Sequence, residues 1–262
     1  MADKGTIHYD FGDDPVYKVI KTAAPGFSET GLWGGVRYPY TVELGKAMNE
    51  MMDSWAKEKL GKIGVPFAPI WAAADTLPEG TDPSLNVAET IKDAGHWSVG
   101  SCPCRLSKWL ADPGNHCDHM LEACILTGDE SRWAVKHGHA RELTYEELVA
   151  HLEELNRDGL VHTLNIQNSI CNCCNDCCAI SFSEKFGPKA FAPSPFIPRV
   201  DVKDCNACDK CAERCPTKAI EVQEFGDTVS VDVEYDKCIG CGVCITACNK
   251  DSMWMERRPA AA

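Results

Sequence analysis

Two runs of cysteines near the C-terminus contain the residues whose type and spacing most clearly point to chemistry. Each run has the spacing C-x2-C-x2-C-x3-C, and together they comprise Cys205, Cys208, Cys211, Cys215, Cys238, Cys241, Cys244 and Cys248. Three thiolates at three-residue intervals on a tightly curled loop can bind three irons of one cubane. A zinc site usually takes paired C-x2-C units with a longer spacer between them. The spacing therefore favours two iron–sulfur clusters over two zinc sites or eight structural thiols.

The same region resembles the two-[4Fe-4S] bacterial-type ferredoxin family over about residues 199–258. Its two halves repeat, because Cys205–Ile220 aligns with Cys238–Met253 without a gap. One departure is Asn249, which stands where the family usually repeats the proline that follows the fourth cysteine, here Pro216. The resemblance implies a small α+β module with internal pseudo-two-fold symmetry, which passes one electron at a time between two low-potential cubanes.

The fourth cysteine of each run is expected to open a helix and to point away from its own run, so that it binds the other cluster. The ligands predicted for cluster I are Cys205, Cys208, Cys211 and Cys248. The ligands predicted for cluster II are Cys238, Cys241, Cys244 and Cys215. Between the two runs, residues 219–222 and 229–233 alternate apolar and polar around a Gly226-Asp227 turn, which predicts a β-hairpin.

Nine further cysteines precede the ferredoxin-like segment, far more than packing alone would require. They are Cys102, Cys104, Cys117, Cys124, Cys171, Cys173, Cys174, Cys177 and Cys178. This density predicts at least one further metal site, and iron–sulfur is favoured over zinc because the chain already carries cubanes. The preferred ligands are Cys102, Cys104 and Cys117, together with Cys171 or Cys173. In the alternative interpretation, some of these residues, such as Cys124, Cys174 and Cys178, are buried free thiols.

Several elements are expected around these cysteines. Helices are expected at 41–60, with a broad apolar stripe, and near 85–94. A helix over 119–127, capped by Gly128, would place Cys124 two turns from Cys117 and on the same side. Thr144 and Glu147 form a capping box that starts a helix, and the chain after Gly159 favours a strand at 160–164.

The helix and strand after Thr144 weakly resemble part of a winged-helix scaffold. The order of the cysteine motifs also resembles that of uncharacterised iron–sulfur proteins in which such a module precedes a dicluster ferredoxin; that resemblance carries no residue roles. The expected fold class is α+β, with a mainly helical cysteine-rich region followed by a dicluster ferredoxin fold. The expected division is an irregular and helical docking region at 1–84, a metal-binding module at 85–198 and the ferredoxin domain at 199–258.

Other cofactor motifs are not found. The histidines of His116-Cys117-Asp118-His119 and His137-Gly138-His139 could be metal ligands, but such residues are more often solvated or satisfied polar contacts. The glycines at 31, 34 and 35 lack the G-x-G-x-x-G spacing of a dinucleotide site, and there is no phosphate-binding loop. The sequence therefore indicates neither a catalytic residue nor a site for NAD, flavin or ATP.

Composition and charge indicate the cellular compartment and the kind of partner. Seventeen cysteines without a secretory signal favour a reducing compartment, so we expect a cytoplasmic protein of an anaerobic or micro-oxic cell. No apolar run approaches the ~20 residues of a membrane helix. The net charge is −13, shared between the ferredoxin-like segment (−3) and the rest (−10). This acidity opposes nucleic-acid binding and suits docking on basic redox partners, although it also serves solubility.

These observations predict an electron-transfer subunit of a multi-subunit oxidoreductase. Two [4Fe-4S] clusters, with at least one further cluster, would relay low-potential electrons to or from a partner that holds flavin, tungsten, molybdenum or another cofactor. One alternative is a reductase in which an upstream cluster binds substrate at an open iron. The other is a redox or oxygen sensor in which loss of a cluster changes a partner interaction.

Overall fold

The computed structural model of the chain describes Lys46, Glu50, residues 68–112, 115–136, 140–164, 169–178, Phe182, 191–226 and 228–259. The aromatic segment 1–40 and most of the helix expected at 41–60 lie outside these residues, although Lys46 and Glu50 are helical. The short helix expected near 85–94 is confirmed as α4 (Val87–Lys92).

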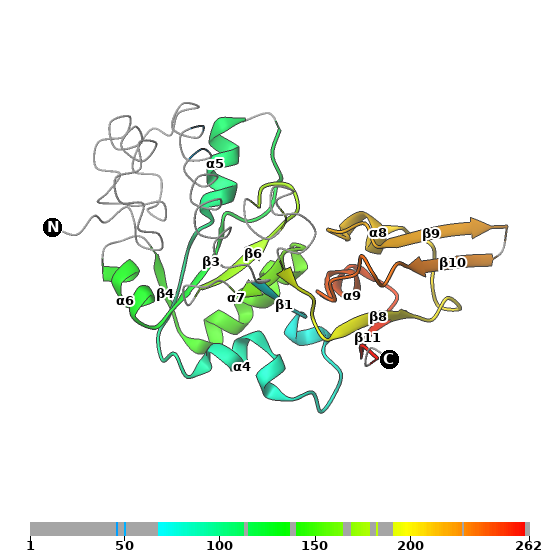
Figure 1. Ribbon diagram of the computed structural model, residues 1–262, viewed down its shortest axis with the longest axis horizontal. Helices are drawn as coiled ribbons and strands as arrows, with labels where there is room; N and C mark the ends of the chain where they lie inside the picture. Colours follow the sequence, from blue (N-terminus) through cyan, green and yellow to red (C-terminus); the bar gives the residue numbers. More distant parts are fainter. Residues whose placement is uncertain are drawn as a thin grey trace.

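A seven-stranded sheet forms the centre of the upstream region, with strand order β4-β2-β3-β6-β5-β1-β7 (Figure 1). The strands are β1 (Ala68–Trp71), β2 (Trp97–Ser101), β3 (Glu122–Thr127), β4 (Arg141–Leu143), β5 (Val161–Leu164), β6 (Ser169–Cys173) and β7 (Phe191–Ala192). Neighbouring strands are antiparallel except β1 and β7, which are parallel. The described part of this region mixes helices with a large sheet, which gives no support to the expectation of a mainly helical region.

Strand β3 forms where the sequence predicts a helix. Residues 123–127 are all buried, so this strand is covered on both faces and lacks the alternation of a half-exposed strand. A short apolar run of this kind cannot be distinguished from a buried helix by periodicity alone. The helix expected at 119–127 does not form, and Gly128, at φ +60°, opens α6 (Gly128–Lys136) instead of closing a helix. Cys124 consequently lies opposite Cys171 of β6.

The helix expected after Thr144 is confirmed as α7 (Tyr145–Arg157). The Thr144 hydroxyl accepts from the Glu147 N–H, and the Glu147 carboxylate accepts from the Thr144 N–H, so the capping box is complete. Leu148 and Leu152 pack against Val99, Ile125 and Ile170 of the sheet. Strand β5 follows as expected, but it pairs with β1 and β6 inside the large sheet, which gives no support to a winged helix.

The C-terminal part contains two short helices and four strands. They are β8 (Phe196–Val200), α8 (Lys210–Arg214), β9 (Ile220–Phe225), β10 (Thr228–Val233), α9 (Val243–Ala247) and β11 (Met253–Arg257). β9 and β10 pair as the predicted hairpin, and β11 pairs with β8. Cys215 and Cys248 lie at the C-terminal ends of α8 and α9, so the expectation that the fourth cysteine opens a helix is wrong. Each five-residue helix contains the third cysteine of its run. The fourth cysteine follows the helix directly and has an extended backbone conformation.

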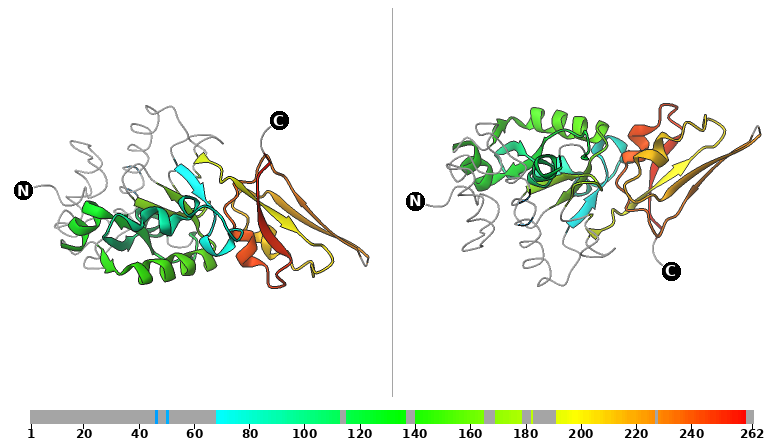
Figure 2. Two further views of the ribbon diagram at one scale, coloured as in Figure 1. Left: turned by 90° about the horizontal axis from the view of Figure 1, so that it is seen from below. Right: turned by 90° about the horizontal axis from the view of Figure 1, so that it is seen from above.

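The two parts of the molecule meet around α9, whereas the β9–β10 hairpin points away from the large sheet (Figures 1 and 2). The Ala73 N–H donates to the Cys241 carbonyl at 3.2 Å. A Cβ at Gly242 would lie 2.6 Å from Thr76 Oγ1, so glycine permits this close approach. The half of the ferredoxin-like part that contains Cys241 therefore packs directly on the upstream region. The division at 1–84, 85–198 and 199–258 stays a prediction.

Among the described helices, none has the length and apolar character needed to cross a membrane.

Gly240 offers a test of the packing between β8 and the second cysteine run. It has φ +70°, and an added Cβ would collide with the carbonyl oxygen of Phe196. Gly226 has a similar φ of +65° but open space around it. We expect Gly226→Ala to cost about 1 kcal/mol from backbone strain and Gly240→Ala roughly 2–4 kcal/mol, because the backbone of β8 must also move. Thermal unfolding of the cluster-loaded variants measures both, and equal losses would contradict the close packing.

Candidate iron–sulfur sites

Cysteines from both runs line one cavity beneath the β9–β10 hairpin. Its volume is about 20 Å³. The thiols on its wall are Cys205, Cys208, Cys211 and Cys248, and its apolar lining comes from Val200, Val222, Val231 and Met253. The cavity therefore joins three cysteines of the first run to the last cysteine of the second.

A second cavity, of about 20 Å³, has the reciprocal composition. Its thiols are Cys215, Cys238, Cys241 and Cys244, and its apolar lining includes Pro198, Ala219, Ile220 and Ile239. Four thiols around a dry cavity are the donor set that a [4Fe-4S] cubane requires, so the residues fit the group. The reciprocal sharing supports the crossed ligand assignment, which we keep as a proposal.

Burial shifts the pKa values of several of these thiols. It raises the pKa of Cys241 to about 12 and the pKa of Cys211 to about 11. Burial alone would also raise the pKa of Cys248, but hydrogen bonds from Ser252 and from nearby backbone N–H groups outweigh it and lower that pKa. Without a bound cation Cys211 and Cys241 therefore favour the neutral thiol, so cluster binding must displace their protons.

The two cavities differ in their access to the surface. Cys208 is exposed, whereas Cys241 and Cys244 are buried. Cys208 Sγ donates to Asn249 Oδ1 at 3.9 Å, so the residue that departs from the family pattern contacts a predicted ligand of cluster I. The cluster I site is therefore the more accessible of the two.

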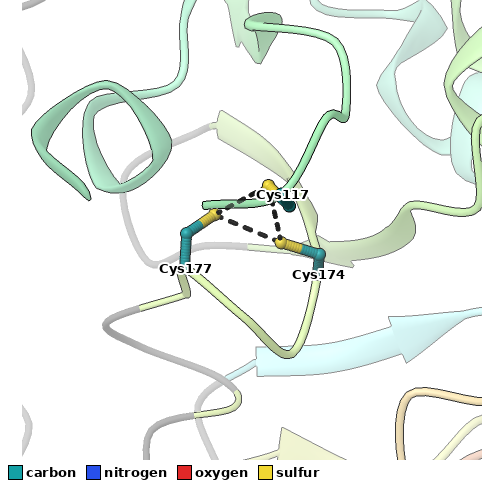
Figure 3. A group of neighbouring side chains, drawn as sticks. All are labelled: Cys117, Cys174 and Cys177. Carbon is teal, nitrogen blue, oxygen red and sulfur yellow. Dashed lines mark hydrogen bonds between the residues drawn. The ribbon is translucent and has the colours of Figure 1, made fainter. Parts of the chain in front are cut away.

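Three upstream thiols converge on a third site (Figure 3). The sulfur–sulfur distances are 3.2 Å between Cys174 and Cys177, 3.7 Å between Cys174 and Cys117, and 3.9 Å between Cys117 and Cys177. Cys102 packs against the same apolar cluster as these residues. Of the predicted upstream ligands, the structure brings Cys117 into this group, and Cys102 packs beside it.

The remaining predicted ligands lie beside it. Cys104, Cys171 and Cys173 line a third cavity of about 20 Å³, together with Cys102, Cys124, Cys174, Cys177 and Cys178. Burial and neighbouring thiols raise the pKa of Cys124, and the hydrogen bond with Cys171 and burial raise the pKa of Cys173. These thiols favour the neutral form, unlike Cys174.

Two members of the three-thiol group, Cys174 and Cys177, were not preferred as ligands from the sequence. The signal that could have found them is their C-x2-C spacing, which is a common metal-binding unit. This spacing is hard to recognise in the sequence because Cys173 and Cys178 flank the pair directly. In the structure Cys173 ends strand β6, and the turn that follows carries Cys174 and Cys177 to Cys117.

The histidines near Cys117 make other contacts. His119 Nδ1 lies 3.2 Å from Asp158 Oδ2, and His116 Nδ1 lies 2.9 Å from the Cys117 carbonyl oxygen. Neither belongs to the group of thiols that meet. His137 and His139 lie outside the described residues.

Comparison with known proteins agrees with this geometry. Residues 204–252 match the family described as a 4Fe-4S dicluster domain. Electron transport protein HydN of Escherichia coli is 31% identical over 100 residues, which cover 34% of this chain and 55% of that protein. Pyruvate synthase subunit PorD of Methanothermobacter marburgensis is 34% identical over 62 residues, which cover 24% of this chain and 68% of that protein. NADH-quinone oxidoreductase subunit I of Pelobacter propionicus is 35% identical over 69 residues, which cover 22% of this chain and 37% of that protein.

The C-terminal region of the chain therefore belongs to the two-cluster ferredoxin family, and it binds two [4Fe-4S] clusters. The chain spans about half the length of HydN. No solved structure matches the chain significantly.

The crossed assignment predicts which variants share a phenotype. Cys215→Ala should remove the same cluster as Cys241→Ala, because both line the second cavity, and Cys248→Ala should remove the same cluster as Cys208→Ala. Electron paramagnetic resonance of the reduced variants identifies the cluster that is lost. If Cys215→Ala instead matched Cys208→Ala, the ligands would not be crossed.

Proposed function

We propose that the chain is an electron-transfer subunit of a multi-subunit cytoplasmic oxidoreductase, relaying low-potential electrons between a partner's cofactor and another redox centre. The observation that carries this proposal is the pair of four-thiol cavities within one small domain. When bound, each cubane accepts and releases one electron without substrate chemistry. The names of HydN, PorD and the NADH-quinone oxidoreductase subunit support such a role, since all three are electron-transport proteins or oxidoreductase subunits.

The protein's own residues act by binding the clusters and by controlling their surroundings. Buried apolar side chains such as Ile239, Val243 and Met253 exclude water, and a dry shell influences the reduction potential of an iron–sulfur cluster. Backbone amides contribute too, because the Ala219 N–H donates to Cys215 Sγ at 3.2 Å. Such hydrogen bonds stabilise negative charge on sulfur and favour the reduced state.

The exposure of the cluster I site favours a redox partner that binds beside this site. Cys208 is exposed there, and the groove beside Cys248 is lined by both basic and acidic side chains, including Lys210, Glu213 and Arg214. The cluster II site faces the upstream region instead. We propose a stable hetero-oligomer with a flavin, tungsten or molybdenum protein. The net charge of −13 disfavours nucleic acid as a partner.

Two variants test the relay. We expect Cys208→Ala and Cys241→Ala each to lose about four irons and at least 90% of the electron-transfer rate between the native redox partner and its acceptor, because each removes one cubane. The assay uses the complex isolated anaerobically from the native host. A surface variant remote from both cavities, Glu146→Gln, serves as the control. Full activity in both cysteine variants, or purification of the chain without any co-eluting subunit, would refute the proposal.

A further inference from the structure

Arg105 is the most unusual buried residue in the upstream region. Its side chain is 0% exposed. Nη1 donates to the Met120 carbonyl, and Nη2 lies 3.4 Å from the Asn172 carbonyl oxygen and 3.9 Å from Cys174 Sγ. Nε has no hydrogen-bond partner in the described part of the chain. Within those residues no carboxylate reaches Arg105 within ion-pair distance. A guanidinium buried without an anion is strongly unfavourable.

The groups able to neutralise Arg105 are the thiols around it. Cys174 Sγ lies 3.9 Å from Arg105 Nη2, and Cys102 and Cys177 line the same cavity as Arg105. A buried cation beside several thiols is the arrangement expected around a group of net negative charge.

The turn from Cys174 to Cys177 is held on both sides. Asp176 Oδ2 accepts from the Cys117 N–H at 3.0 Å, and Asp176 Oδ1 accepts from Lys108 Nζ at 3.1 Å. Asp176 therefore ties the Cys117 loop and α5 (Pro103–Ala111) to this turn. Cys102 lies directly before α5, as its N-cap. The Cys117 loop and the Cys174–Cys177 turn are thus positioned with their sulfurs facing one another (Figure 3), and Cys102 packs against the same apolar cluster.

We propose that Cys102, Cys117, Cys174 and Cys177 bind a third [4Fe-4S] cluster, with Arg105 as its buried counter-charge. Four thiols would release their protons on binding and, with the 2+ core of an oxidised cubane, would leave a net charge of about −2, which a guanidinium partly offsets. The adjoining cavity has a volume of about 20 Å³, the same as the cavities at the two ferredoxin sites. A disulfide would use only two of the sulfurs.

The proposed site adjoins the cluster II site. Asn175, inside the Cys174–Cys177 turn, donates through Nδ2 to the Pro216 carbonyl at 3.0 Å. Pro216 follows Cys215, which lines the cluster II cavity. Arg214 also donates to the Arg157 carbonyl at the end of α7. These contacts suit electron exchange between the upstream centre and cluster II, and they leave the cluster I site free for a partner.

The test is a metal count that does not depend on any activity. The full chain is reconstituted anaerobically with ferrous iron and sulfide, and iron, acid-labile sulfide and zinc are measured per chain. We expect about twelve irons in the unmodified chain and about eight in the double variant Cys174→Ala/Cys177→Ala, with the two ferredoxin resonance signals retained. Cys102→Ala should show the same loss. The matched control is Cys124→Ala, which removes a thiol from the same cavity but not from the proposed ligand set, and it should keep about twelve.

The outcomes separate this proposal from the relay function. About eight irons in the unmodified chain, zinc in place of the third cluster, or a Cys174–Cys177 disulfide would overturn it while leaving the two-cluster relay intact. Equal loss of iron in Cys124→Ala, or none in Cys102→Ala, would overturn the ligand set. Retention of the ferredoxin signals in every variant confirms that the chain has folded.

Arg105 is a positioning residue in this proposal, and it has its own readout. Arg105→Gln should lower the midpoint potential of the third cluster, because loss of a nearby positive charge makes acceptance of an electron less favourable. Arg105→Lys keeps the charge and should restore most of the shift. Redox titration followed by electron paramagnetic resonance measures this potential beside those of clusters I and II, which should not move. A third-cluster potential that is unchanged in Arg105→Gln would contradict the counter-charge role.

Discussion

Thiolates are stable inside a protein only where positive charge or hydrogen-bond donors compensate for the water they have lost, and this constraint organises the molecule. At the ferredoxin sites, burial raises the pKa of Cys211 and Cys241, so the bound cluster itself must supply the compensating charge. At the upstream site, Arg105 is already present beside Cys174. The two kinds of site therefore meet the same electrostatic requirement by different means.

Rigid elements make this charge arrangement possible. The paired strands β3 and β6 place Cys124 opposite Cys171, and the turn after β6 carries Cys174 and Cys177 towards Cys117. In the C-terminal domain, short helices and extended fourth cysteines let each half contribute a sulfur to the other cavity. Ligands held by backbone hydrogen bonds lose little conformational entropy when a metal binds, which favours binding.

The contact between the two parts links these sites in space. Cys241 and Gly242 pack on Ala73 and Thr76, while Asn175 reaches the residue after Cys215. One end of the ferredoxin domain is thereby covered by the upstream region, and the end that carries Cys208 is open. This asymmetry is not present in the repeat itself, since the two cysteine runs have identical spacing. It arises because the upstream sheet covers one half of a pseudo-symmetric domain.

The sequence by itself determined the two-cluster ferredoxin domain, its β-hairpin and the capped helix α7, because each depends on residues close together in the chain. Spacing within a curled loop, turn residues between alternating strands and a capping box are local signals. Only the tertiary structure decided that 122–127 is a strand and that Cys117 meets Cys174 and Cys177. Strand pairing and the burial of both faces of β3 are properties of distant segments, and a buried run of apolar residues has no periodicity from which to predict them.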